Sequence, residues 1–146
     1  MKLYLDNCCY NRPYDDQRQE KIHMEGEAIL AIINRCRQNN DAIVGSPALD
    51  FEIDNIENSE KKEKVKFFYN QTISIKTDYT TEIFDRVQEL NKQTSIRTLD
   101  IYHLSIAEYS DVDVLLTTDI KFEKAVSKLN LNIRVLNPLK YLMEVI

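Results

Sequence analysis

The chain has 146 residues, of which 43% are hydrophobic and 29% are charged, and its formal net charge is −5. These values fit one ordinary globular domain with a real core, and they exclude a disordered chain. No run approaches the ~18 apolar residues that a transmembrane helix needs, and the apolar run after Met1 is too short for a signal peptide. We therefore expect a cytoplasmic protein that does not enter a membrane.

The counts of glycine and cysteine exclude further classes. With only two glycines, the chain has no glycine-rich loop of the kind that cradles nucleotide phosphates. The cysteines Cys8, Cys9 and Cys36 contain no C-x-x-C pair, and they have no spacing typical of a zinc site. An odd number of cysteines without a secretion signal predicts reduced thiols.

Short apolar runs alternate with longer segments of helical periodicity along the whole chain. Strands are predicted at residues 2–5, 42–44, 72–75, 112–117 and 132–136. Helices are predicted at about 18–38, from Ser46 onward, at 59–70, 80–92, 98–109 and 121–128, and after Pro138. Ser46, Ser59 and Thr98 are expected to cap their helices. This alternation predicts an α/β fold in which helices cover both faces of a parallel sheet.

Two aspartates follow predicted strands of this sheet. Asp6 ends the first strand and Asp119 ends the fourth, so both are expected at the carboxyl edge, where α/β sheets bind their ligands. The alternative for each is a structural one, since aspartate is common in turns and as a helix cap.

Two more acids fall on the inner side of predicted helices. Glu52 lies beside the apolar stripe formed by Leu49 and Ile53, where an acid needs a partner or a metal. Its alternative is a pair with an arginine. Asp100 lies in the first turn of its helix, where the dipole also favours a carboxylate, and it shares the buried face with His103. His103 is expected to be a core histidine with satisfied hydrogen bonds.

These four acids come from four elements and are expected to meet at one edge of the sheet. Carboxylates that close together repel one another in a partly desolvated site, and a hard divalent cation removes that repulsion. Mg²⁺ and Mn²⁺ accept carboxylate oxygens and substrate phosphate oxygens together. The chemistry that suits such a cluster is phosphodiester hydrolysis.

Four motifs, taken in order, resemble one known family. They are YLDN at 4–7, Ser46 with Glu52 six residues on, LDIYHLSIA at 99–107, which follows a D-x-x-H-L-x-x-A pattern, and DVLLTTD at 113–119. Together they resemble the PIN-domain family of metal-dependent ribonucleases over nearly the whole chain. Residues 5–16 are also similar to small stand-alone bacterial PIN proteins of the VapC-like class, many of which are toxins of type II toxin–antitoxin modules.

The resemblance implies a complete set of expectations. The fold is a single domain over residues 1–146, a three-layer α/β/α sandwich whose five-stranded parallel sheet has the order 3-2-1-4-5. The activity is Mg²⁺- or Mn²⁺-dependent endoribonuclease activity, the substrate is RNA, and the partners are a protein antitoxin and a second copy of the chain. The residues that hold the metal and carry catalysis are Asp6, Glu52, Asp100 and Asp119.

Substrate contacts are expected from polar residues close to the first and fourth strand ends, namely Asn7, Asn11, Arg12, Thr117 and Thr118. The guanidinium of Arg12 matches the geometry of a phosphate. Its alternative is a salt bridge to Glu52, Asp15 or Asp16. Asp113 also matches an acidic position of the family, but it begins the fourth strand at the far edge and is expected to be structural.

Two other functions remain open from the sequence. One is a PIN-like module that has lost catalysis and binds RNA or protein. The other is a receiver-type domain phosphorylated on Asp6, for which Lys140 is poorly placed. The net charge of −5 argues against strong nonspecific RNA binding, so local basic patches decide. The patches expected are Arg12 with Arg18, Arg35 with Arg37, and the lysines of 61–66.

Overall fold

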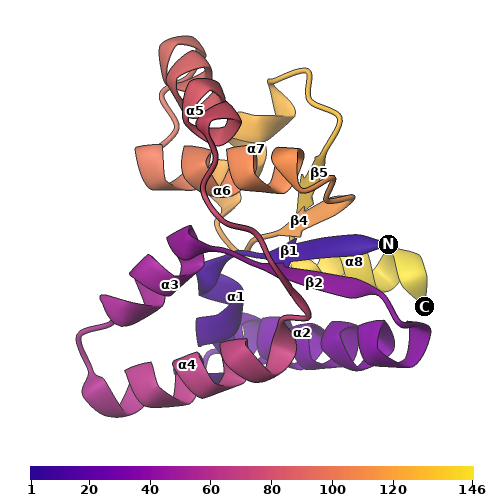
Figure 1. Cartoon of the computed structure of the whole chain (residues 1–146). Coiled ribbons are helices and arrows are strands. Elements are labelled where there is room, and N and C mark those ends of the chain that lie inside the picture. Colours follow the sequence, from indigo (N-terminus) through magenta and orange to yellow (C-terminus); the bar gives the residue numbers. More distant parts are fainter.

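Five parallel strands form one sheet in the order β3-β2-β1-β4-β5 (Figure 1). The computed structural model describes all residues from Met1 to Ile146. The strands are β1 (Lys2–Leu5), β2 (Ala42–Gly45), β3 (Ile75–Lys76), β4 (Val114–Leu116) and β5 (Arg134–Leu136). The strand order that the family resemblance implied is therefore confirmed.

Helices cover both faces of this sheet. They are α1 (Asn7–Asn11), α2 (Glu20–Asn39), α3 (Pro47–Asp54), α4 (Ser59–Thr72), α5 (Thr81–Gln93), α6 (Thr98–Tyr109), α7 (Ile120–Ser127) and α8 (Pro138–Val145), with a 3₁₀ turn, η1 (Arg12–Tyr14), after α1. Figure 1 shows α1, α2, α4 and α8 on one side and α5, α6 and α7 on the other. The α/β class and the three layers are as expected. No helix is both long and apolar enough to cross a membrane.

Strand β1 occupies the centre of the sheet and the topology reverses beside it. From β1 the chain proceeds outward to β2 and β3, and it then crosses back to β4 and β5 on the other side of β1. Right-handed crossovers send the helices of the two halves to opposite faces. The crevice beyond the carboxyl ends of β1 and β4 is the place where such a sheet binds ligands.

The core is centred on β1 and β4, whose side chains are covered from both faces. Tyr4 pairs with Leu115 and Leu5 with Leu116, and all four side chains are fully buried. Strands buried on both faces read as continuous apolar runs, which is the pattern that the sequence shows. This packing fixes the position at which β1 ends, one residue before Asp6.

Several predicted boundaries differ from the structure. The third strand is Ile75–Lys76 rather than 72–75, because Thr72 completes the buried stripe of α4. The cap of α4 is Asn58, whose side chain accepts from the Lys61 N–H, and Ser59 is already helical. Helix α6 begins at Thr98 itself, without a side-chain cap.

No helix was predicted between Asp6 and residue 18, but this segment forms α1 and η1. Helix α1 is short, and its start is fixed by the Asp6 carboxylate that accepts from the Asn7 N–H. Five residues are too few for helical periodicity to be visible in a sequence. The cysteines, expected to be reduced, are all unpaired.

The two glycines provide a matched test of the packing beside β2. A Cβ built on Gly45 would lie 2.6 Å from the Tyr69 hydroxyl oxygen and 2.6 Å from Ile73 Cδ1. A Cβ on Gly26, within α2, would meet its nearest atom at 3.6 Å, an ordinary contact. Gly45→Ala is therefore expected to lower the free energy of unfolding by about 1–3 kcal/mol.

In the same urea titration, Gly26→Ala should be neutral or raise the free energy of unfolding by about 0.5–1 kcal/mol, because alanine is the better helix residue. Equal effects of the two substitutions would contradict the close approach of α4 to Gly45.

Candidate metal centre at the carboxyl edge of the sheet

Three donors hold the Asp6 carboxylate at the end of β1, one of them the Cys8 thiol at 3.5 Å from Oδ2. The Asn7 N–H donates to Oδ1 at 2.7 Å, which caps α1, and the Thr117 hydroxyl donates to Oδ2 at 2.9 Å. The residue is only 5% exposed. Each carboxylate oxygen can accept more than one bond, so both keep capacity for a further partner. The structural role foreseen for Asp6 and its candidate metal role therefore coexist.

Thr117 connects Asp6 to the end of β4. Its hydroxyl donates to Asp6 and accepts from the backbone N–H of Asp119 at 3.1 Å. Asp119 is exposed and caps α7, where its Oδ1 accepts from the Phe122 N–H at 3.2 Å. Asp119 thus lies at the same edge as Asp6 with its other oxygen free of protein donors.

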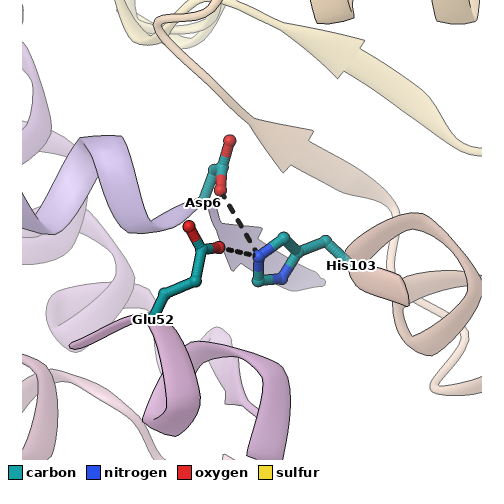
Figure 2. Close-up of side chains that lie close together, drawn as sticks. All are labelled: Asp6, Glu52 and His103. Atoms are coloured by element: carbon teal, nitrogen blue, oxygen red, sulfur yellow. Dashed lines mark hydrogen bonds and ion pairs between the residues drawn. The ribbon is translucent and has the colours of Figure 1, made fainter. Parts of the chain in front are cut away.

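Glu52 is oriented by a buried chain of hydrogen bonds, of which Figure 2 shows the first, from Glu52 to His103. Its Oε1 bonds His103 Nε2, while His103 Nδ1 bonds the Tyr4 hydroxyl at 2.5 Å. The Tyr4 hydroxyl in turn bonds Ser46 Oγ at 2.7 Å, and Ser46 caps α3, the helix that carries Glu52. This series of hydrogen bonds begins and ends at the same helix, because Ser46 caps α3 and Glu52 lies within it.

His103 is fully buried with both ring nitrogens engaged, as expected for a satisfied core histidine. Burial lowers its pKa, but the hydrogen bond to Glu52 and the charges of Asp6, Glu52 and Asp100 raise it, and the net pKa lies above the ordinary value. The sequence had not foreseen that this histidine holds Glu52. The direct hydrogen-bond partner of Glu52 is therefore a histidine, and the arginine pair named as the alternative for Glu52 is present as well, with Arg97.

Asp100 is buried in the first turn of α6 beside a cation from its own chain. Arg97 Nη2 lies 3.0 Å from Asp100 Oδ1 and 3.8 Å from Glu52 Oε2. Burial raises the pKa of the Asp100 carboxyl; the Arg97 bond opposes this and the Asp6 charge adds to it, so the pKa lies above the ordinary value. Sequence reasoning missed Arg97, which is more than half exposed and acts as a counter-cation for two acids.

The donor set can bind a metal ion. Asp6, Glu52 and His103 each offer one ligand atom, and these atoms lie within 4.8 Å of one another (Figure 2). Because both nitrogens of His103 are used by Tyr4 and Glu52, the free donors are carboxylate oxygens, which hard cations prefer. Asp100 and Asp119 lie outside this tight group. The Arg97 guanidinium lies between Asp100 and Glu52, so positive charge is already present beside these two carboxylates.

The remaining polar residues named from the sequence divide into two groups. Thr118 is buried beside Asp119. Asn11 Nδ2 donates to the Asn7 carbonyl at 2.8 Å, one turn earlier in α1, so these two asparagines stabilise the helix. Arg12 binds Asp15 at 3.1 Å, as its alternative foresaw, and also binds Glu25 at 2.9 Å, which was not foreseen.

Asp113 has the structural role expected for it. Its Oδ2 accepts from the backbone N–H of Lys2 at 2.8 Å, at the amino edge of the sheet and away from the four acids.

The same arrangement of strands and helices occurs in solved structures. The crystal structure of VapBC2 from Rickettsia felis bound to a DNA fragment from their promoter contains a chain that matches with a TM-score of 0.61 and 16% identity, over 94% of this chain and 98% of that chain. FitAcB from Neisseria gonorrhoeae matches with a TM-score of 0.61 and 14% identity, over the same shares of the two chains. The chain has a VapC/PIN-like fold. No model of a protein family matches the sequence, and no curated protein matches it.

Two buried tyrosines of this PIN-like fold test the hydrogen-bond chain that orients Glu52. Tyr4→Phe removes the hydroxyl between Ser46 and His103 and leaves buried polar atoms unpaired. We expect a loss of about 1–3 kcal/mol in the free energy of unfolding by urea titration. The hydroxyl of Tyr10 is buried without any partner, so Tyr10→Phe should be neutral or stabilising. A similar cost for both substitutions would contradict the role of Tyr4.

Asp100→Asn tests the crowding of the acids. A carboxyl whose pKa is raised in the folded state contributes stability only below its unfolded pKa, and that contribution is lost as the pH rises through the folded pKa. In EDTA at about pH 7.5 the variant should therefore have a higher Tm than the wild type, and the difference should fade towards about pH 4. With Mn²⁺ the wild type should gain more than the variant. A lower Tm for the variant in EDTA would show that the carboxylate is structural.

Proposed function

We propose that this protein is a metal-dependent endoribonuclease that hydrolyses RNA phosphodiester bonds at the carboxyl edge of the sheet, and that it is the toxin of a type II toxin–antitoxin module. The observation that carries the proposal is the convergence of Asp6, Glu52 and Asp100 from three elements beyond β1, in a fold shared with chains of VapBC2 and FitAcB. The partner expected on this basis is a protein antitoxin, and a homodimer is expected as well.

The residues proposed to hold a Mg²⁺ or Mn²⁺ ion are Asp6, Glu52, Asp100 and Asp119. An ion bound there supplies a Lewis acid for the phosphoryl oxygen and lowers the pKa of a bound water. Thr117 and the Asn7 N–H hold the Asp6 carboxylate in place, and the His103–Tyr4–Ser46 chain holds Glu52. Fixed carboxylates cost no reorganisation when the charge of the phosphodiester develops.

Two side chains are proposed to act on the substrate side of this centre. In the absence of a metal ion, the Arg97 guanidinium pairs with Glu52 and Asp100. Its side chain is long and more than half exposed, so it can turn toward a phosphate when a metal ion binds to these carboxylates. Thr118, beside Asp119, is a second candidate contact. Arg12 is held by Glu25 and Asp15, which makes it a support of the α1 segment rather than a free phosphate ligand.

The second candidate function is a PIN-like module that binds RNA or protein without cleaving it. The presence of all four acids weighs against this, since a cluster of carboxylates suits a hard divalent cation and phosphodiester hydrolysis.

The decisive experiment measures cleavage of single-stranded and structured RNA with Mn²⁺ or Mg²⁺. Asp6→Asn and Asp100→Asn are expected to slow cleavage by at least about 100-fold, because the loss of a metal ligand removes several kcal/mol of transition-state stabilisation. The matched control is Asp111→Asn, which removes one charge at the opposite edge in an exposed residue of φ 57°, a conformation that asparagine tolerates.

Calorimetric titration of Mn²⁺ into the same variants separates the two functions. Metal binding and cleavage that disappear together in Asp6→Asn support the nuclease. A wild type that binds no metal and cleaves no RNA under these conditions would favour the binding module.

A further inference from the structure

A second feature of the carboxyl edge is a cavity of about 330 Å³ beyond β4 and β5, within the about 300–1,000 Å³ typical of ligand pockets. Three elements from both layers meet around it: the start of α2, the first turns of α7 and the first turns of α8. Its seven lining residues are Lys21, Ile120, Glu123, Lys124, Asn137, Leu139 and Lys140.

Lysine ammonium groups dominate the charge of this cavity. Lys21 and Lys124 are exposed and form no ion pair, while Lys140 pairs with Glu123 at 2.5 Å. None of these lysines belongs to the basic patches that the sequence suggested, because they are far apart in the chain and meet only through the fold. In a protein of net charge −5, they form a local positive region, and exposed charges beyond ~8 Å are largely screened.

The cavity is one strand away from the candidate metal centre. The Asp6 N–H donates to the Leu116 carbonyl at 2.9 Å, and the Thr117 N–H donates to the Leu136 carbonyl at 3.1 Å. These bonds align Asp6, Thr117 and Asn137 side by side at the ends of three adjacent strands. Ile120, on the wall of the cavity, directly follows Asp119. A chain molecule bound at the acids can therefore continue into the cavity without leaving the surface.

The wall beside α8 is rigidly built. Asn137 is buried, its Nδ2 donates to Glu25 Oε2 at 2.6 Å, and its Oδ1 accepts from the Leu139 N–H at 2.8 Å. Glu25 is itself fully buried and also holds Arg12. This buried carboxylate fixes the start of α8 relative to α2, and so fixes the distance between the lysines that the two helices contribute.

We propose that this cavity is the subsite that receives the nucleotide next to the cleaved bond of a single-stranded RNA; the assignment rests on the proposed function. The lysines attract the phosphates as point charges, and the exposed side chain of Ile120, with Leu139, provides an apolar wall for the sugar and base. The two regions differ in charge. The carboxylates repel a phosphate unless a cation is bound between them, whereas the lysine ammonium groups attract it directly.

The test uses the intact protein in EDTA with a 5′-fluorescein-labelled single-stranded RNA of about 15 nucleotides and measures fluorescence anisotropy. Lys21→Glu/Lys124→Glu is expected to weaken binding at least about tenfold and to lower the salt slope by about 1.4, because each phosphate of a single strand that a lysine neutralises adds about 0.7 to that slope. The matched control, Lys92→Glu/Lys128→Glu, changes the net charge equally at two exposed lysines, one in α5 and one directly after α7, that also form no ion pair and do not line the cavity.

Equal weakening by the two double variants would overturn the subsite, because the effect would then be one of net charge. Unchanged binding by Lys21→Glu/Lys124→Glu would overturn it as well. In the presence of Mn²⁺, the subsite predicts that this variant raises the KM for RNA about tenfold with kcat retained, and that hydrolysis of the small diester bis(4-nitrophenyl) phosphate is unchanged.

The two readouts distinguish this proposal from the proposed function. A wild type that hydrolyses neither RNA nor the small diester contradicts the nuclease and with it the subsite, while the anisotropy comparison still decides whether the cavity binds RNA. A nuclease that cleaves both substrates, but whose KM for RNA does not respond to the two lysines, keeps its function and loses the subsite.

Discussion

The position of β1 in the middle of a parallel sheet is the constraint on which the rest of the structure depends. Because β1 pairs with β2 on one side and β4 on the other, Asp6 is placed between the loop that leads to Glu52 and the loop that leads to Asp119. Parallel pairing requires all strand ends to face one edge, so the acids need no long-range recognition of one another to converge. The hydroxyl of Tyr4, in β1, forms hydrogen bonds with Ser46 and with His103 of α6, and so ties α6 to the same edge of the sheet.

Structural and chemical roles are combined in the same carboxylates. Asp6 and Asp119 cap α1 and α7, which uses part of their hydrogen-bonding capacity and leaves the rest at the edge of the sheet. A helix N-terminus stabilises a nearby carboxylate, which offsets part of the repulsion among acids at one site. The other two acids have neighbouring partners: Glu52 forms a hydrogen bond with His103, and the Arg97 guanidinium lies beside both Asp100 and Glu52. The crowded edge is therefore tolerable without a metal, and a bound cation has a clear competitor in Arg97.

The class of fold and the position of Asp6 at a strand end were predictable from the sequence, because periodicity and a strand-end aspartate are local signals. The strand order came instead from the resemblance to a known family. The orientation of Glu52 was not predictable, since it depends on a contact between α3 and α6 across 51 residues of chain. Helix α1 and the start of α4 were missed for local reasons: one is too short to show periodicity, and the other has a capping asparagine followed by a serine that could also cap. The pairing of Arg12 with the buried Glu25 was equally invisible, because nothing in a sequence distinguishes a buried glutamate on a long helix from a solvated one.

For the proposed nuclease activity, a chain of net charge −5 needs positive charge where RNA would enter, and the fold brings lysines together there without a basic sequence motif. The lysines of α2, α7 and α8 come from positions 21, 124 and 140, and they become neighbours only because β5 places the start of α8 beside the ends of β4 and β1. Glu25 connects this region to the segment after Asp6 through Arg12 and Asn137, so the acidic centre and the lysine cavity share one buried anchor. A substitution at Glu25 would therefore displace both regions together, whereas the loss of a single lysine would change only the charge of the cavity.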